Sequence, residues 1–232
     1  MIRRLLTGAL DTAVGVAWWF RSLVEGGSAA AFTQPGPDPR HHTPLVILPG
    51  IWERWTYLVP LARSLHDAGH PVWLLPTLGA NGQPIGGAAD VVADFLLAED
   101  LSGVILVGHS KGGLIGKLVM LDEAVADRVR GMVTFGTPFA GSSLSVPILR
   151  RSPLGIFAPK GSTIVELAEQ QEVNSRIISL QPTLDQMVPE GSVLPGARNV
   201  TLEVVGHYRP TRDGRTHQAI HHWLHELEET TT

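Results

Sequence analysis

Residues 104–113 constrain the fold of this chain more than any other segment. Four consecutive apolar residues, 104–107, are typical of a strand buried on both faces, and the apolar spacing of 114–120 indicates a helix. The turn between them reads Gly-His-Ser-Lys-Gly, a G-x-S-x-G motif centred on Ser110. In this motif a sharp strand-to-helix turn strains the serine backbone and exposes the hydroxyl, and the glycines avoid Cβ collisions. Ser110 is therefore the candidate nucleophile, the alternative being an ordinary serine in a glycine-rich turn.

The composition indicates one globular domain and excludes several classes of protein. A chain of 232 residues is long enough to bury a sizeable core. Hydrophobic residues make up 44% and charged residues 17%, as in folded rather than disordered proteins, and the net charge of -4 gives no footprint for nucleic acid. Because the chain has no cysteine, it has no disulfide, thiolate nucleophile or thiolate metal site.

The N-terminal segment predicts an amphipathic helix with a wide apolar face. Residues 5–20 are mostly apolar, but Asp11 interrupts them and the stretch is too short and polar for a membrane span. Small or polar residues recur at helical spacing: Arg4, Gly8, Asp11, Gly15 and Ser22. We favour a helix that packs on the domain or on a partner. The alternatives are a membrane-surface anchor aided by Arg3, Arg4 and the tryptophans, and a signal peptide cleaved near residues 29–31.

Strand-like and helix-like segments alternate after a proline-rich linker at 33–43. We expect strands at 45–48, 72–75, 104–107, 131–135, 176–180 and 200–205. We expect helices at 55–68, 88–97, 114–120, 163–172 and 217–227. This alternation predicts an α/β fold, a mostly parallel sheet with helices on both faces. The chain then divides into an N-terminal helix and linker, 1–34, and an α/β domain, 35–232.

Residues 139–175 interrupt the alternation and suggest a cap over an apolar pocket. The segment is rich in Gly, Ser and Pro with isolated apolar residues, and long excursions of this kind are usually functional. The alternative is a surface loop packed on the body. The side chains that we expect to contact substrate come from this segment and from the loops near Ser110: Trp52, His109, Phe139, Ile156 and Phe157.

A serine nucleophile needs a base, and the base needs an orienting acid. His207 follows the predicted strand 200–205, so it should lie at the sheet edge where Ser110 emerges. By contrast, two histidines lie in the linker, His41 and His42, and four lie on the last helix, His217, His221, His222 and His225. Asp185 follows the strand 176–180 through a short turn containing Pro182, and is the preferred acid. Glu190 is the second choice for this acid.

An acyl-transfer site also needs backbone donors for the developing oxyanion. The N–H of Lys111, directly after the nucleophile, is one candidate. The loop after the first core strand should supply the other, and Ile51 N–H is preferred, with Trp52 next. The alternative is that this loop is a plain strand-to-helix turn.

From about residue 44 to residue 227 the chain resembles the α/β-hydrolase superfamily, on its lipase and esterase side. The motifs that carry the resemblance are Gly-His-Ser-Lys-Gly-Gly at 108–113, Leu-Pro-Gly-Ile-Trp at 48–52, Gly-Thr-Pro at 136–138, Asp-Gln-Met-Val-Pro at 185–189, Leu-Pro-Gly-Ala-Arg-Asn-Val at 194–200 and Gly-His at 206–207. In such enzymes the aspartate of an Asp-x-x-Val-Pro turn and the histidine of a Gly-His step complete the triad, which implies Asp185 and His207. Two departures are Pro49, where lipases often have a His-Gly pair, and Lys111, where a neutral residue is usual.

These observations predict an esterase or lipase that acts through an acyl-enzyme on a small-molecule or lipid ester with an apolar acyl group. The alternatives are a thioesterase or acyltransferase with the same triad, and a non-catalytic binding protein of the same fold. We expect no cofactor, no metal and no nucleic-acid partner; His217, His221 and His225 share a helix face, but we read it as solvated. We expect a cytoplasmic protein with weak membrane-surface association through the N-terminal helix, and the signal-peptide alternative leaves secretion open.

Overall fold

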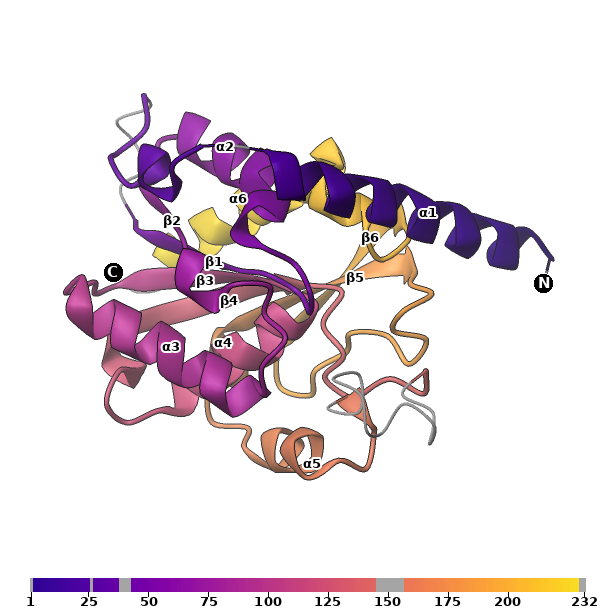
Figure 1. Cartoon of the computed structure of the whole chain (residues 1–232). Helices are drawn as coiled ribbons and strands as arrows, with labels where there is room; N and C mark the ends of the chain where they lie inside the picture. The colour runs from indigo at the N-terminus through magenta and orange to yellow at the C-terminus, as the bar shows by residue number, and fades with distance from the viewer. Residues whose placement is uncertain (1, 26, 38–42, 145–156, 230–232) are drawn as a thin grey trace.

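The computed structural model describes residues 2–25, 27–37, 43–144 and 157–229. Its centre is a six-stranded, wholly parallel sheet in the order β2-β1-β3-β4-β5-β6 (Figure 1). The strands are β1 (Leu45–Leu48), β2 (Val72–Leu74), β3 (Val104–His109), β4 (Val129–Phe135), β5 (Ile177–Leu184) and β6 (Arg198–Val205). The predicted parallel α/β sheet is therefore confirmed.

Helices cover both faces of this sheet (Figure 1). The helices are α1 (Ile2–Val24), α2 (Val59–Asp67), α3 (Ile85–Ala98), α4 (Lys111–Leu121), α5 (Ser162–Glu169) and α6 (Gly214–Glu229). Helices α2 and α6 lie on one face, with α1 on their side of the molecule, and α3 and α4 lie on the other. Each face has its own buried apolar cluster, and the alternate side chains of β3 divide between them.

The topology brings the candidate residues to one edge of the sheet. In a parallel sheet all carboxyl ends lie together, and the segments that follow β1, β3, β5 and β6 all leave from this edge. The strand β3 is central and pairs with β1 and β4, so the turn at Ser110 lies beside the loop that follows Leu48. Ligand sites of open α/β sheets lie at this edge.

The strand β5 is longer than the sequence predicts. We expected a strand at 176–180 and a turn at Pro182, but the strand continues through Pro182 to Leu184, so Asp185 follows it directly. Beyond Leu180 the strand pairs with β6 alone, because its register with β4 ends there. A proline is tolerated on such an edge, where a missing N–H breaks no ladder bond.

Helix α1 packs on the domain with the face opposite to the one expected. The buried positions are the small and polar residues Gly8, Asp11, Gly15 and Ser22, which follow one helical stripe. The large apolar residues that remain exposed include Leu5, Leu6, Leu10 and Phe20. The prediction of a buried apolar face is therefore wrong for most of this helix. The reason is steric, since at Gly15 a Cβ would lie 2.3 Å from the ring of Tyr208, so a larger side chain could not approach.

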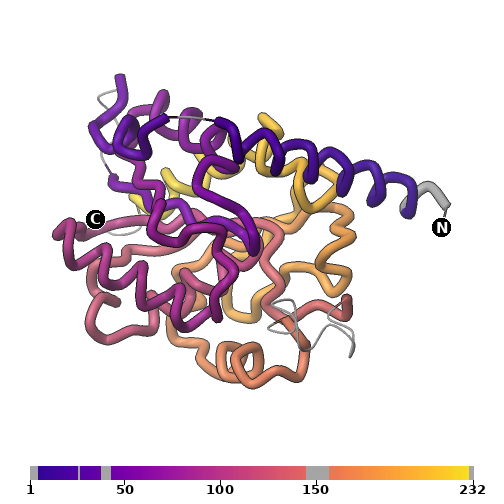
Figure 2. The backbone as a smooth tube through the Cα atoms, viewed as in Figure 1, coloured from indigo at the N-terminus to yellow at the C-terminus, as the bar shows by residue number. Residues whose placement is uncertain are grey.

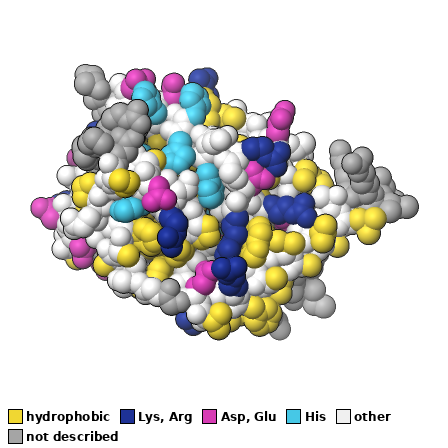
Figure 3. All heavy atoms as spheres, turned by 90° about the horizontal axis from the view of Figure 1, so that it is seen from above, with side chains coloured by type: hydrophobic (Ala, Val, Ile, Leu, Met, Phe, Trp, Pro, Cys, Tyr) yellow, Lys and Arg dark blue, Asp and Glu magenta, His cyan; other side chains and the backbone are white. Residues whose placement is uncertain are grey.

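Two tryptophans are the exception to this pattern. Trp18 and Trp19 pack partly against the apolar cluster on the α2 and α6 side of the sheet. Figure 2 shows α1 crossing the upper face, with the two chain ends on opposite sides of the molecule. Figure 3 looks down on this face, and hydrophobic side chains extend over it toward the end of the molecule where α1 begins. Among the described residues, no helix is long and apolar enough to cross a membrane.

The described ends of the predicted cap pack against the body. Ile164 and Leu167 of α5 are buried in the cluster on the α3 and α4 side, together with Phe139 and Phe157. Ser142 N–H donates to the carbonyl of Phe157 at 2.7 Å, so the parts of the segment before residue 145 and after residue 156 contact each other. Residues 145–156, including Ile156, lie outside the described residues.

Candidate active site

Ser110 occupies the strained turn between β3 and α4. Its φ of 52° and ψ of -119° are unusual for a residue with a side chain, and such strain is concentrated at functional sites. A Cβ on Gly112 would lie 2.1 Å from the carbonyl oxygen of Leu48, and one on Gly108 would lie 2.7 Å from the amide of Gly113. The two glycines of the motif are therefore required for the turn from β3 into α4 to pack against β1.

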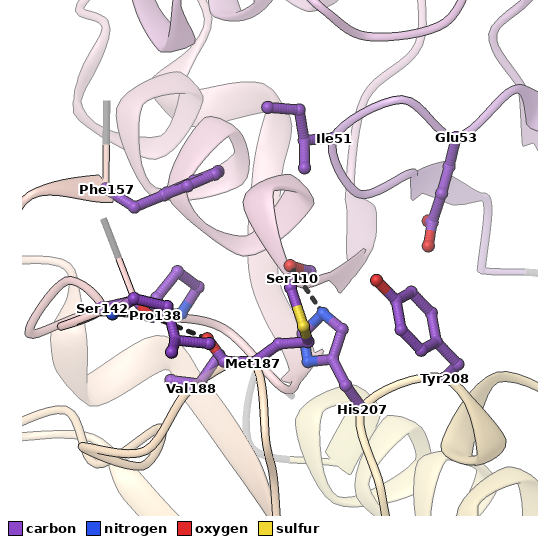
Figure 4. A pocket seen from close by; sticks show the side chains of 11 residues that line it. Ile51, Glu53, Ser110, Pro138, Ser142, Phe157, Met187, Val188, His207 and Tyr208 are labelled. Atoms are coloured by element: carbon purple, nitrogen blue, oxygen red, sulfur yellow. Dashed lines mark hydrogen bonds between the residues drawn. The ribbon is translucent and has the colours of Figure 1, made fainter. Parts of the chain in front are cut away.

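The structure brings Ser110, His207 and Asp185 together in one hydrogen-bonded line. The Ser110 Oγ lies 3.1 Å from His207 Nε2, and His207 Nδ1 lies 2.8 Å from Asp185 Oδ2. The other carboxylate oxygen of Asp185 accepts the N–H groups of Met187 at 2.8 Å and Val188 at 2.9 Å. All three side chains are at least 93% buried, so the line is shielded from bulk water. Figure 4 shows the His207 ring turned toward Ser110.

Charge and hydrogen bonding set the pKa values of this pair. Burial alone lowers the pKa of the His207 imidazole, but the charge of Asp185 and the hydrogen bond to it outweigh burial, so this pKa lies above its ordinary 6.5. Burial raises the pKa of Asp185, but the His207 charge and its hydrogen bonds outweigh burial and hold this pKa below its ordinary 3.8. The carboxylate of Asp185 therefore stays ionised at neutral pH.

Two backbone N–H groups are available beside the nucleophile. Lys111 is the first residue of α4, so its N–H has no partner inside the helix. Ile51 follows β1 and lines the same cavity as Ser110, and its N–H makes no hydrogen bond within the described part of the chain. These two N–H groups are the ones that the sequence predicts as donors to the oxyanion.

The side chain of Lys111 points away from the reacting atoms and holds a loop. Its ammonium group donates to the Asn81 carbonyl at 2.9 Å, to the Asn81 side chain at 3.0 Å and to the Gln83 carbonyl at 2.5 Å. Asn81 in turn donates to the carbonyls of Pro49 at 2.7 Å and Gly50 at 3.2 Å. The unusual lysine of the motif thus acts through Asn81 on the loop that presents Ile51. Burial lowers the pKa of Lys111 to about 8.

His109 does not contact the cavity, which corrects our expectation for substrate binding. It is completely buried, stacks on Phe135, and places Nδ1 2.9 Å from Glu53 Oε2 and Nε2 3.2 Å from the carbonyl of His207. Both nitrogens of the His109 ring therefore face protein oxygen atoms, and these contacts hold the ring away from the cavity. His109 therefore supports the backbone of His207.

Glu53 is a functional candidate that sequence reasoning missed. Its Oε2 accepts the N–H of Gly50 at 2.7 Å as well as His109, and it is 4% exposed. A carboxylate three residues after a glycine in a tight loop was the only available signal. Glu53 fixes the loop next to Ile51.

The cavity at Ser110 is small, about 60 Å³. Its lining is mostly apolar and includes Ile51, Pro138, Leu144, Phe157, Met187 and Val188. Phe157 is therefore placed as expected, whereas Phe139 lies in the apolar cluster and does not line this cavity. The residues Met187 and Val188 were not predicted; they come from the turn that follows Asp185.

A second, larger cavity of about 300 Å³ lies between α1 and the loop after β1. Its apolar walls include Val16 and Trp19 of α1 and Trp52 of the loop. It shares Ile51, Glu53 and Tyr208 with the cavity at Ser110, so these three residues separate the two spaces. Trp52, expected to contact substrate, thus lines the second cavity, and its carbonyl accepts the indole N–H of Trp19 at 2.6 Å.

Glu190, the second candidate for the acid, and the histidines His217 and His221 of α6 make hydrogen bonds outside the candidate active site. Glu190 accepts the N–H of Ser143 at 2.9 Å and does not contact His207. His217 lies 3.1 Å from the carbonyl of Thr211, and His221 lies 3.1 Å from the Ser64 hydroxyl. Over the described ranges, no group of three His, Asp or Glu side chains is arranged to hold a metal ion.

Known proteins resemble this chain in fold. The model of a family described as PGAP1-like alpha/beta domain matches residues 97–150, which include Ser110 and the strands β3 and β4. No curated protein matches the chain.

Similar solved structures cover most of the chain. A monoacylglycerol lipase from Paleococcus ferrophilus superposes with a TM-score of 0.62 at 18% identity and covers 83% of this chain and 96% of its own. An alpha/beta hydrolase from a metagenome of sediments of the Mar Chica lagoon, Morocco, superposes with a TM-score of 0.60 at 19% identity. It covers 81% of this chain and 93% of its own. A Bacillus licheniformis lipase superposes with a TM-score of 0.59 at 15% identity and covers 84% of this chain and 96% of its own. At these identities the comparison concerns the fold.

Proposed function

We propose that this chain, which has the α/β-hydrolase fold, is a serine hydrolase of carboxylic esters with an apolar acyl group. The observation that carries the proposal is the hydrogen-bonded line from Ser110 Oγ through the His207 ring to Asp185, built on a strained serine backbone. A buried serine in an ordinary turn requires neither a histidine nor a carboxylate behind it. The lipases and other hydrolases of similar fold support the same reaction class.

The geometry supports acyl transfer in two steps. Neutral His207 takes the Ser110 proton as Oγ attacks the ester carbonyl, and Asp185 stabilises the imidazolium that forms. The N–H groups of Ile51 and Lys111 are the proposed donors to the tetrahedral oxyanion. His207 then returns the proton to the leaving alcohol, and a water activated by the same ring hydrolyses the acyl-enzyme.

The cavities support an ester with apolar substituents. The space at Ser110 accommodates a short apolar group, and the larger space beyond Ile51 is walled by Val16, Trp19 and Trp52. We propose that a longer chain of the substrate lies in the second cavity, since each buried CH₂ contributes about 0.8 kcal/mol.

We further propose weak membrane-surface association through the outer face of α1. Leu5, Leu6 and Phe20 are 66%, 66% and 60% exposed, although the opposite face of the helix is buried on the domain. Apolar side chains exposed along one helix face favour an interfacial location. The same helix lines the second cavity, so this location would bring apolar esters to the site.

Turnover of p-nitrophenyl butyrate by wild type and by Ser110→Ala tests the proposal. We expect steady hydrolysis by wild type and loss of at least about 10³-fold in the variant, because removal of the nucleophile leaves only binding and the oxyanion donors. A butyryl thioester offered in parallel distinguishes a thioesterase. Equal activity of the variant would overturn the proposal, and no turnover of any ester would favour a binding protein.

A further inference from the structure

The carboxylate of Asp11 binds the backbone of the loop that carries His207. Its Oδ2 accepts the N–H of His207 at 2.8 Å and of Tyr208 at 3.0 Å, and its Oδ1 accepts the N–H of Arg209 at 3.0 Å. Asp11 lies on α1 and is completely buried. One side chain therefore satisfies three consecutive amides that are almost 200 positions away in the sequence.

The same carboxylate also reaches the loop that carries Asp185. Gln186 Nε2 donates to Asp11 Oδ2 at 2.7 Å and to the Thr12 hydroxyl at 3.2 Å. Gln186 directly follows Asp185, and His207 directly follows Gly206. Asp11 thus links the segments after β5 and β6, the two segments that must hold their side chains in line with Ser110.

The chain is shaped to bring Asp11 to this position. Gly206 has a φ of +105°, and a Cβ there would lie 2.2 Å from Asp11 Oδ1. A Cβ on Gly8 would lie 2.9 Å from the Gln186 side chain. The close approach of α1 on both sides of Asp11 therefore depends on glycines in both partners.

Among the described residues, no backbone carbonyl accepts the N–H groups of residues 207–209. Strand β6 ends at Val205, so the amides of 207–209 lie beyond the sheet ladder. Tyr208, which precedes the short helix Arg209–Thr211, provides no side-chain cap of its own. Backbone N–H groups that are buried without an acceptor are costly, so the loop would shift to find one.

We propose that Asp11 is a positioning residue for the His207 imidazole and that α1 is consequently part of the active site. This inference rests on the proposed function, since it concerns what keeps the His207 ring aligned with Ser110 and Asp185. Asp11 does not touch substrate; it fixes the backbone from which the ring extends. Misplacement of an acid-base group by about an ångström lowers turnover far more than substrate binding.

Asp11→Asn is the test, because it keeps the shape of the side chain and replaces one acceptor with an N–H₂ donor. Thr56→Val is the matched control. The Thr56 hydroxyl donates to the Ser22 carbonyl at 2.7 Å, so this variant loosens α1 without touching the His207 loop. The measurements are kcat and KM on p-nitrophenyl butyrate, the burst amplitude that counts competent sites, and the melting temperature.

We expect Asp11→Asn to lower kcat per competent site at least tenfold with KM within twofold of wild type. Thr56→Val should lower the melting temperature but keep kcat per site. If Asp11→Asn yields no folded protein, Asp11→Glu replaces it and should still lower kcat at least threefold. A wild-type kcat in the Asp11 variant would overturn the inference. So would a loss of kcat in Thr56→Val equal to the loss in the Asp11 variant. Absence of turnover and of fluorophosphonate labelling in wild type would instead overturn the proposed function.

Discussion

Glu53 and His109 form a buried pair behind the candidate active site, with 2.9 Å between Glu53 Oε2 and His109 Nδ1. The same oxygen accepts the N–H of Gly50, and His109 Nε2 lies 3.2 Å from the carbonyl of His207. One pair therefore connects the loop of the proposed oxyanion donor Ile51 to the backbone of the proposed base.

Glu53→Gln should consequently impair turnover without removing a reacting group. The amide keeps the shape but weakens the bonds to Gly50 and His109, so we expect kcat to fall roughly 10- to 100-fold, less than the loss of an oxyanion donor itself. KM and the melting temperature should change little by comparison. Glu123→Gln, at an exposed position, is the control and should match wild type. A Glu53→Gln enzyme with wild-type kcat would contradict this role.

The pKa of His207 predicts the acid side of the pH profile. Only the neutral imidazole can take the Ser110 proton, and its pKa lies above 6.5, so kcat/KM should fall as the pH drops through a value above 6.5. Asp185, whose pKa lies below 3.8, stays ionised across this range.

Asp185→Asn should move this limb to lower pH and lower kcat on the order of 10⁴-fold, because the imidazolium loses its anionic partner while burial remains. Glu190→Gln should leave both unchanged, since Glu190 accepts the N–H of Ser143 and, among the described residues, makes no hydrogen bond to His207. A pH-rate series on p-nitrophenyl butyrate measures both effects. A larger loss in Glu190→Gln than in Asp185→Asn would show that the acid is assigned wrongly.

The second cavity predicts a chain-length preference that depends on α1. Val16→Trp should fill part of the space beside Trp52 and raise KM for long-chain esters, by about fourfold for each CH₂ excluded, while acetate and butyrate esters react as before. Ala17→Trp, at the adjacent exposed position, adds the same ring outside the cavity. Equal chain-length profiles for the two variants would place the long chain elsewhere.

The exposed face of α1 predicts binding to anionic lipid vesicles. Leu6→Ser combined with Phe20→Ser should weaken vesicle binding at least fivefold in a sedimentation assay, with an unchanged melting temperature, because both side chains point away from the domain. Val165→Ser on α5 removes an exposed apolar group elsewhere and is the control. Undiminished binding by the double variant would exclude this face as the membrane contact.

The sequence predicts the sheet and the main candidates because they depend on local patterns. Apolar runs mark β1 and β3, and the G-x-S-x-G turn and the Gly-His step place Ser110 and His207 at strand ends. The strand at Asp185 was predicted too short, because Pro182 usually ends a strand unless it lies on an edge, and an edge is defined only by the partner strands.

The contributions of Asp11 and Glu53 could not be predicted, because both act on partners far away in the sequence. Asp11 appears in the sequence only as a break in an apolar helix, and its function depends on amides at 207–209. The predicted orientation of α1 was wrong for the same reason. Large apolar side chains were expected to be buried, but the contact with Tyr208 admits only glycine at position 15.

Covalent labelling of Ser110 tests the central claim most directly. Wild-type protein incubated with a fluorophosphonate probe should gain one phosphonyl group, located by mass spectrometry on the peptide that contains Ser110. Ser110→Ala should remain unlabelled, and His207→Ala should label at least about 10³-fold more slowly, because the hydroxyl then has no base. Labelling of another residue, or equal labelling rates in wild type and His207→Ala, would contradict the account.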